Sequence, residues 1–187
     1  MKKVTKLIAI AIAGVAIFFA TNAKAQTVDK SAWRLGVGVE GGLPTGDIHN
    51  ATSWDLGGTL RLQYGIDKNV AVMITSGYYN FFGKNYSQTD IDPISGAVTT
   101  TTVKGPNFGL IPVKAGAKVF FNSPIYVSGE AGAGFETVSG GKTRLLLSPG
   151  LGWANHSWDI GARYENLSGG GVNYGLINLR VAYGFTL

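Results

Sequence analysis

The chain has 187 residues, 28 glycines and no cysteine, and 14% of its residues are charged against 45% that are hydrophobic. A chain without cysteine excludes a disulfide scaffold and a thiolate metal site. Low charge together with many aromatic residues argues against a disordered chain and against a helical bundle. The length fits one domain, and the formal net charge of +5 raises the question of a nucleic-acid partner.

The first 25 residues have the pattern of a secretory signal peptide. Three early lysines precede an uninterrupted apolar run at 7–20, and Ala23-Lys24-Ala25 forms a small-x-small cleavage site. The run is shorter than the about 20 residues that a membrane-spanning helix needs. We therefore expect export through the Sec pathway, cleavage after Ala25 and a single domain over 26–187. Without the leader the chain has 12 basic and 11 acidic residues, so we expect no nucleic-acid partner.

Apolar and polar residues alternate with a period of two along the rest of the chain, which is the pattern of β-strands with two different faces. No window shows a sustained helical period. The alternation predicts eight strands, at 32–43, 54–64, 70–81, 106–121, 125–136, 142–153, 158–166 and 174–187. Pro112 and Pro149 fall inside predicted strands, where each removes a ladder donor, so we expect a bulge or a strand end near each.

Charge is confined to one face of the predicted strands. The apolar face carries no Asp, Glu, Lys or Arg. The opposite face carries seven cations and six anions: Arg34, Arg61, Lys114, Lys118, Arg144, Arg163 and Arg180, and Glu40, Asp55, Glu130, Glu136, Asp159 and Glu165. A transmembrane barrel turns its apolar face to lipid and encloses the polar one, whereas a soluble periplasmic ligand-binding barrel would do the reverse. Alternation alone is compatible with both.

Aromatic residues and connection lengths favour the membrane. Large aromatics lie near the ends of the predicted strands, as in the two aromatic girdles of a barrel that crosses two interfaces. The predicted girdle consists of Trp54, Tyr64, Phe81, Phe108, Phe121, Phe135, Trp153, Trp158, Tyr174 and Phe185. Short and long connections tend to alternate, and 82–105 is the longest. These features predict an all-β fold, a closed antiparallel eight-stranded transmembrane β-barrel, because an even strand number closes such a barrel without an edge.

The sequence resembles the small outer-membrane β-barrels of the OmpA/OmpX type, which are porin-like proteins of Gram-negative bacteria. The resemblance lies in the leader followed by alternating strands and in glycine-spaced stretches such as 111–118 and 126–132. The last strand, with Tyr183, Phe185 and Leu187 in phase, is similar to the signal that such proteins present to the outer-membrane assembly machinery, although members usually end in an aromatic residue. The resemblance implies an outer-membrane location with lipid and lipopolysaccharide around the barrel.

The predicted function is structural and interactional. Eight strands leave a lumen that side chains fill, so we expect the interior charges to pair and do not expect a general diffusion pore. An unknown extracellular partner would bind the loops, above all 82–105. We expect no cofactor and no metal, and interpret Asp90 and Asp92 in that loop as solvated, because a calcium site needs six or more oxygens.

A lipid-modifying enzyme is the alternative from another class. Outer-membrane enzymes on eight-stranded barrels use His and Ser near the outer leaflet, and His49 lies close in sequence to Ser53. A nucleophile needs such a neighbouring base. The same segment is also ordinary turn chemistry, so we expect no enzymatic activity.

Overall fold

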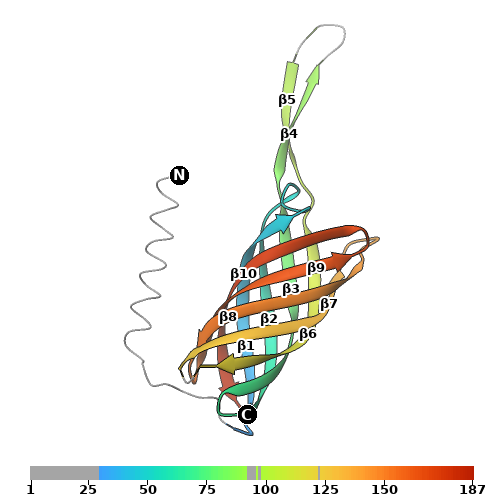
Figure 1. The fold of residues 1–187 in the computed structure, drawn as a ribbon. Coiled ribbons are helices and arrows are strands. Elements are labelled where there is room, and N and C mark those ends of the chain that lie inside the picture. Colours follow the sequence, from blue (N-terminus) through green and yellow to red (C-terminus); the bar gives the residue numbers. More distant parts are fainter. Residues whose placement is uncertain (1–29, 92–95, 97, 122) are drawn as a thin grey trace.

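Eight strands form a closed antiparallel barrel in the computed structural model (Figure 1), which describes residues 30–91, 96, 98–121 and 123–187. The predicted signal peptide lies outside the described residues. The barrel strands are β1 (Trp33–Gly46), β2 (Thr52–Asp67), β3 (Val70–Gly83), β6 (Phe108–Phe120), β7 (Ile125–Glu136), β8 (Thr143–Ala154), β9 (Trp158–Gly169) and β10 (Val172–Thr186). Each pairs with its neighbours in the chain, and β1 pairs with β10 to close the sheet. The predicted fold class is confirmed.

The longest connection contains two further strands that the sequence analysis did not predict. β4 (Asn85–Ile91) and β5 (Val98–Lys104) form a separate two-stranded sheet, paired from Asn85 with Lys104 to Ile91 with Val98. Figure 1 shows this hairpin projecting from the barrel end opposite to the C-terminus. We call the barrel end that carries it the hairpin end. The interpretation of 82–105 as a loop was wrong, because strands with both faces exposed show no apolar alternation.

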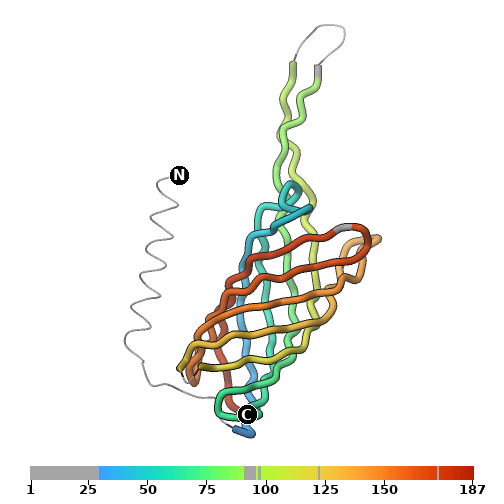
Figure 2. The backbone as a smooth tube through the Cα atoms, viewed as in Figure 1, coloured from blue at the N-terminus to red at the C-terminus, as the bar shows by residue number. Residues whose placement is uncertain are grey.

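The apolar face of the barrel points outward. Val39, Leu151 and Leu179 are each more than half exposed, whereas charged residues such as Arg180 and Glu165 are fully buried. Figure 2 shows the tilted strands wrapping around a single enclosed interior. Soluble proteins rarely expose apolar patches of more than a few hundred Å², so this continuous band is a lipid-facing surface. The alternative of a soluble barrel with an apolar interior is wrong.

Among the residues that the structure describes, no helix is long and apolar enough to cross a membrane.

Seven of the ten predicted girdle aromatics follow the outward phase of their strands. Six of them, Trp54, Tyr64, Phe121, Phe135, Trp158 and Phe185, lie on the outer surface with at least part of the ring exposed. Trp153 has the same phase but is only 9% exposed. Tyr64 packs on Trp33 with ring centroids 4.8 Å apart, and Trp54 stacks on Phe82 at 4.1 Å.

Phe81, Phe108 and Tyr174 were assigned wrongly to the girdle. They belong to the inward phase of their strands: Phe81 and Tyr174 are buried and Phe108 packs against them. Phe81 stacks on Phe108 with centroids 4.4 Å apart. Successive side chains of a strand point to opposite faces. Phe81 lies three residues after the outward Tyr78 in β3, so it must point inward. The girdle assignment relied on nearness to a strand end and ignored this alternation.

The two prolines do not produce bulges. Pro112 pairs with Gly134 and Pro149 with Gly129 in ladders that run without a register shift. The other ladder of each strand has a gap. Pairing between β3 and β6 is interrupted from Ser76 to Tyr79, opposite Pro112. Pairing between β8 and β9 is interrupted from Leu147 to Gly150, around Pro149. The expected bulge or strand end was wrong, because the missing proline N–H is accommodated by a gap in one ladder.

Candidate functional site: the charged barrel interior

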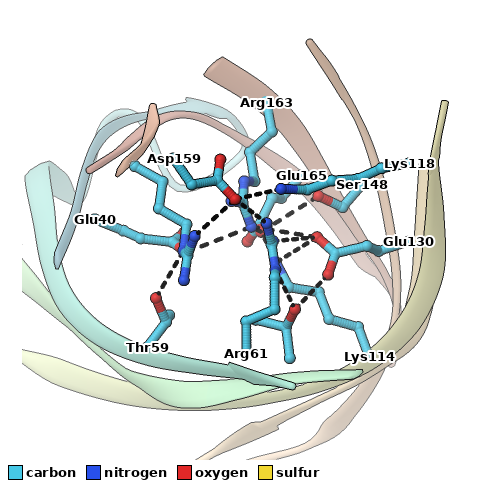
Figure 3. Close-up of polar contacts among 12 residues, drawn as sticks. Glu40, Thr59, Arg61, Lys114, Lys118, Glu130, Ser148, Asp159, Arg163 and Glu165 are labelled. Carbon is cyan, nitrogen blue, oxygen red and sulfur yellow. Dashed lines mark hydrogen bonds and ion pairs between the residues drawn. The ribbon is translucent and has the colours of Figure 1, made fainter. Parts of the chain in front are cut away.

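Nine charged side chains from six strands meet inside the barrel, at its middle (Figure 3). We call them the charged cluster: Glu40, Arg61, Lys114, Lys118, Glu130, Asp159, Arg163, Glu165 and Arg180, none of which is more than 7% exposed. All of them were predicted from the polar phase of their strands. A buried charge costs several kcal/mol unless it is paired and hydrogen-bonded, so the contacts of each carboxylate decide what the cluster does.

Glu130 has three cations within ion-pair distance. Its Oε2 lies 3.1 Å from Arg61 Nη2, 3.3 Å from Arg163 Nη1 and 3.9 Å from Lys114 Nζ. The Thr75 hydroxyl donates to its Oε1 at 2.5 Å. The side chain therefore ties together strands β2, β3, β6 and β9 from its own place on β7.

Asp159 and Glu40 each form ion pairs with more than one cation of the cluster. Asp159 forms an ion pair with Lys118 and lies 3.5 Å from Arg61 and 3.6 Å from Arg180, and the Tyr126 hydroxyl donates to it at 2.7 Å. Glu40 lies 3.2 Å from Arg180 Nε.

Further contacts complete the environments of Glu40 and Glu165. Arg163 lies 3.4 Å from Glu40, and the Tyr79 hydroxyl donates to Glu40 at 2.9 Å. Glu165 forms its ion pair with Lys114. Every carboxylate of the cluster thus has at least one cation within ion-pair distance.

The cluster fills the lumen. Five cations face four carboxylates within it, so the charges nearly balance. A cavity beside Arg34, Arg61 and Arg180 has a volume of only ≈ 10 Å³, about the space of one water molecule.

Above the cluster, toward the hairpin end, the interior is apolar. We call this region the apolar plug: Tyr79, Phe81, Leu110, Leu146, Leu167, Tyr174 and Leu176, all buried, with Ile48 and Phe108 packed against them. The sequence analysis missed it because these positions lie on the phase interpreted as polar. A signal was present, since Leu145-Leu146-Leu147 breaks the alternation and must place one leucine inside.

The remaining predicted interior charges lie outside the cluster. Near the hairpin end Arg144 Nε donates to Glu136 at 2.5 Å, and the Tyr174 hydroxyl approaches the same carboxylate at 3.3 Å. At the opposite end Arg34 donates to the carbonyl oxygen of Asn155 at 2.9 Å. Asp55 is fully buried, and no ion pair joins it to any of the described residues.

The residues weighed for catalysis and for metal binding are not assembled into a site. His49 Nδ1 lies 3.1 Å from the carbonyl oxygen of Pro44, and no hydrogen bond joins His49 to Ser53 within the part of the chain that the structure describes. Asp90 accepts from Gln88 at 3.4 Å, and Asp92 lies outside the described residues. No group of three or more potential metal ligands occurs among those described.

Comparison with known proteins adds the fold family. No family model and no curated protein sequence matches the chain. Among solved structures, Ail, the attachment invasion locus protein of Yersinia pestis, is 18% identical with a TM-score of 0.58, over 84% of this chain and 100% of Ail. A second Ail structure, in complex with the heparin analogue sucrose octasulfate, gives a TM-score of 0.56 at 18% identity over the same shares of both chains.

A third solved structure extends the likeness to another outer-membrane protein. OprG from Pseudomonas aeruginosa is 10% identical with a TM-score of 0.50, over 88% of this chain and 99% of OprG. Identities this low speak for the fold alone. The chain therefore has the fold of the small eight-stranded outer-membrane β-barrels.

Proposed function

We propose that the protein is an integral outer-membrane barrel with a closed lumen, which anchors the β4–β5 hairpin outside the cell for contact with a partner. The proposal rests on the contrast between the filled barrel and the exposed hairpin. The barrel interior is filled by paired charges and the apolar plug, whereas the hairpin stands clear of the barrel (Figure 1). A rigid scaffold that presents an exposed segment is a common arrangement for binding.

The composition of the hairpin suits a contact surface that remains soluble. β5 carries four consecutive threonines, Thr99 to Thr102, and all of them are exposed. Tyr86 on β4 is 54% exposed. Hydroxyl groups on both faces together with an exposed aromatic ring can contact polar and sugar surfaces without an apolar patch that would aggregate in water.

Three further elements of the proposal concern the environment of the barrel. Lipid and lipopolysaccharide surround the apolar band, and Lys84, Lys104 and Lys142 at the hairpin end suit the phosphates of lipopolysaccharide. The assembly machinery recognises β10 and the residue after it, where Tyr183, Phe185 and Leu187 are exposed. The protein reaches the outer membrane by Sec export, with cleavage after Ala25.

We also propose that the protein is not an enzyme. The His49 ring is engaged by the Pro44 carbonyl group and does not reach Ser53 through a hydrogen bond, so the base and nucleophile of the alternative hypothesis are not in a catalytic arrangement. Unchanged lipid A in cells that overproduce the protein is the expected result. A modified lipid A that disappears in the Ser53→Ala variant would contradict this proposal.

The chain contains no cysteine, which makes a labelling experiment specific. Thr100→Cys places one thiol on the hairpin, and the matched control Ser157→Cys places one in the turn at the opposite end of the barrel. A membrane-impermeant maleimide should label the first variant in intact cells and the second only after the outer membrane is permeabilised. Equal labelling of both in intact cells, or of neither, would contradict the location and orientation proposed.

The interaction itself is tested with a photo-crosslinking amino acid at Thr101 on the hairpin, compared with one at Leu151 on the lipid-facing surface. We expect the hairpin position to give a discrete cross-linked protein or polysaccharide species on irradiated cells, and the barrel position to give lipid adducts only. Adducts confined to lipid at both positions would contradict the interaction role and leave the membrane location intact.

A further inference from the structure

Asp55 is a buried carboxyl group that the charged cluster does not neutralise. It is 0% exposed, and neither of its oxygens has a hydrogen-bond partner among the described residues. The charged groups that act on it most strongly are two other carboxylates, Glu165 and Glu40. An isolated buried carboxylate is too costly to persist and takes up a proton instead.

One neighbouring side chain is placed to share that proton. Asn178 is 1% exposed, and neither atom of its amide group has a hydrogen-bond partner within the described part of the chain. Gly42 on β1 is the cross-strand partner of both residues, Asn178 on β10 and Asp55 on β2. The three positions therefore form one inward-facing row across three adjacent strands.

The glycine at the middle of this row leaves space that the Asn178 side chain enters. A Cβ atom added to Gly42 would overlap Asn178 Oδ1 and would come within 2.7 Å of the Ile177 carbonyl oxygen. The Asn178 oxygen therefore occupies the space where any other residue would have a side chain. Directly opposed residues have Cβ atoms about 4.5–5.5 Å apart, so this space lies within reach of the Asp55 carboxyl group. Two acceptor oxygens can be neighbours in a dry interior only when a proton lies between them.

We propose that Asp55 and Asn178 form a proton-binding site, in which Asp55 is a neutral carboxylic acid and its hydroxyl donates to Asn178 Oδ1 above Gly42. The site lies at the boundary between the apolar plug and the charged cluster, since Asp55 pairs across the sheet with Phe81 of the plug. The charged and titratable groups of the surrounding strands are Glu40 (β1), Tyr79 (β3), Lys114 (β6), Arg163 and Glu165 (β9) and Arg180 (β10).

These surroundings disfavour the ionised form. The cations already belong to Glu40 and Glu165: Arg163 and Arg180 contact Glu40, and Lys114 contacts Glu165. Release of the proton would add a third carboxylate to these two, at a position whose cross-strand partner is Phe81 of the plug. The site therefore couples the packing of the plug to pH, with the closed interior favoured when the proton is bound.

The test compares the wild-type chain with Asp55→Asn, each refolded in lipid vesicles and unfolded with urea between pH 5 and pH 8. An unfolded carboxyl group ionises near pH 4, so above that pH folding of the wild type takes up a proton. Its stability should therefore fall as pH rises, relative to the always neutral variant. The ratio of folding constants, Asp55→Asn over wild type, should rise by up to about tenfold per pH unit.

Glu130→Gln is the matched control, because Glu130 is an interior carboxylate that is ionised and paired. Its removal should cost a similar amount of stability at every pH from 5 to 8, because a carboxylate that is ionised in both the folded and the unfolded chain takes up no proton on folding. Parallel pH profiles for Asp55→Asn and wild type would overturn the proposal. A loss of stability in Asp55→Asn that stays constant across this range would overturn it in the same way, and would mean that the Asn178 amide faces Asp55 with its nitrogen and stabilises the anion.

A spectroscopic measurement keeps the proposal testable without a folded variant. Wild-type protein labelled with ¹³C at the aspartate carboxyl groups should show the infrared carbonyl band of a protonated acid at pH 7 in the folded state. The band should vanish when the protein is unfolded in urea at the same pH. Its absence from the folded protein would overturn the proposal.

Discussion

Loss of a single interior carboxylate should destabilise the barrel strongly. Glu130→Gln keeps the size and shape of the side chain but removes its charge from three cations, Arg61, Arg163 and Lys114, at 3.1, 3.3 and 3.9 Å. The charged cluster already has five cations and four carboxylates, so the variant leaves five against three. Breaking a buried ion pair from one side costs about 3–5 kcal/mol, and we expect a loss in that range.

The same reasoning predicts a smaller loss when a cation is removed. In Arg61→Met, Glu130 keeps Arg163 and Lys114, and Asp159 keeps its contacts with Lys118 and Arg180. The variant also restores an equal number of charges of each sign. Its methionine can pack in place of the aliphatic part of the arginine.

The assay is equilibrium unfolding by urea in lipid vesicles at pH 7, followed by tryptophan emission and by gel mobility of unheated samples. The free energy of unfolding should rank wild type above Arg61→Met and Arg61→Met above Glu130→Gln. A loss below about 1 kcal/mol for Glu130→Gln, the value typical of exposed ion pairs, would contradict the conclusion that the charges of the cluster are buried from water and stabilise one another. So would a larger loss for Arg61→Met.

Three other substitutions test separate parts of the structure. Leu146→Ala opens a cavity in the apolar plug, where Leu146 is fully buried, and should lower the free energy of unfolding by about 2–5 kcal/mol in the same assay; a change below the lower bound would show that the plug is loosely packed. Its neighbour Leu147 points outward, and Leu147→Arg should cost about 2–4 kcal/mol in a bilayer, an effect that should vanish in short-chain detergent if the residue faces lipid. Gly42→Ala forces Asn178 and the β10 backbone to move and should cost about 1–3 kcal/mol, whereas Gly58→Ala, where a Cβ meets no atom within 4 Å, should refold like wild type.

The fold could be predicted from sequence because period-two alternation is a local signal that every barrel strand repeats. Residues such as Leu60 and Arg61 can be assigned to opposite faces by their chemistry alone. Alternation of this kind predicted the number of barrel strands and the phase of most of their residues. The direction of the apolar face needed the structure, since a sheet that closes on itself can enclose either face. The exposed positions of Val39 and Leu151 decide that question.

The charged residues of the interior were predicted from sequence, but the contacts among them were not. Which carboxylate meets which cation depends on the stagger of strands across the barrel, and Glu130 reaches Arg61 from the far side of the sheet order. Asp55 was grouped with the paired charges because it shares their phase. Its isolation follows from its height in the barrel, level with Phe81, which only the register reveals. The hairpin escaped prediction for a different reason: Thr99 to Thr102 have strand propensity but no alternation.

The most direct test of the account is the quenching of tryptophan emission by brominated lipids after the protein has been refolded into vesicles. Trp33, Trp54 and Trp158 are exposed on the outer face of the barrel, near the strand ends. We expect strong quenching by bromine placed near the headgroups and weak quenching by a water-soluble quencher. Emission unaffected by brominated lipid, from a protein that stays soluble without detergent, would contradict a barrel that carries its apolar face in the membrane.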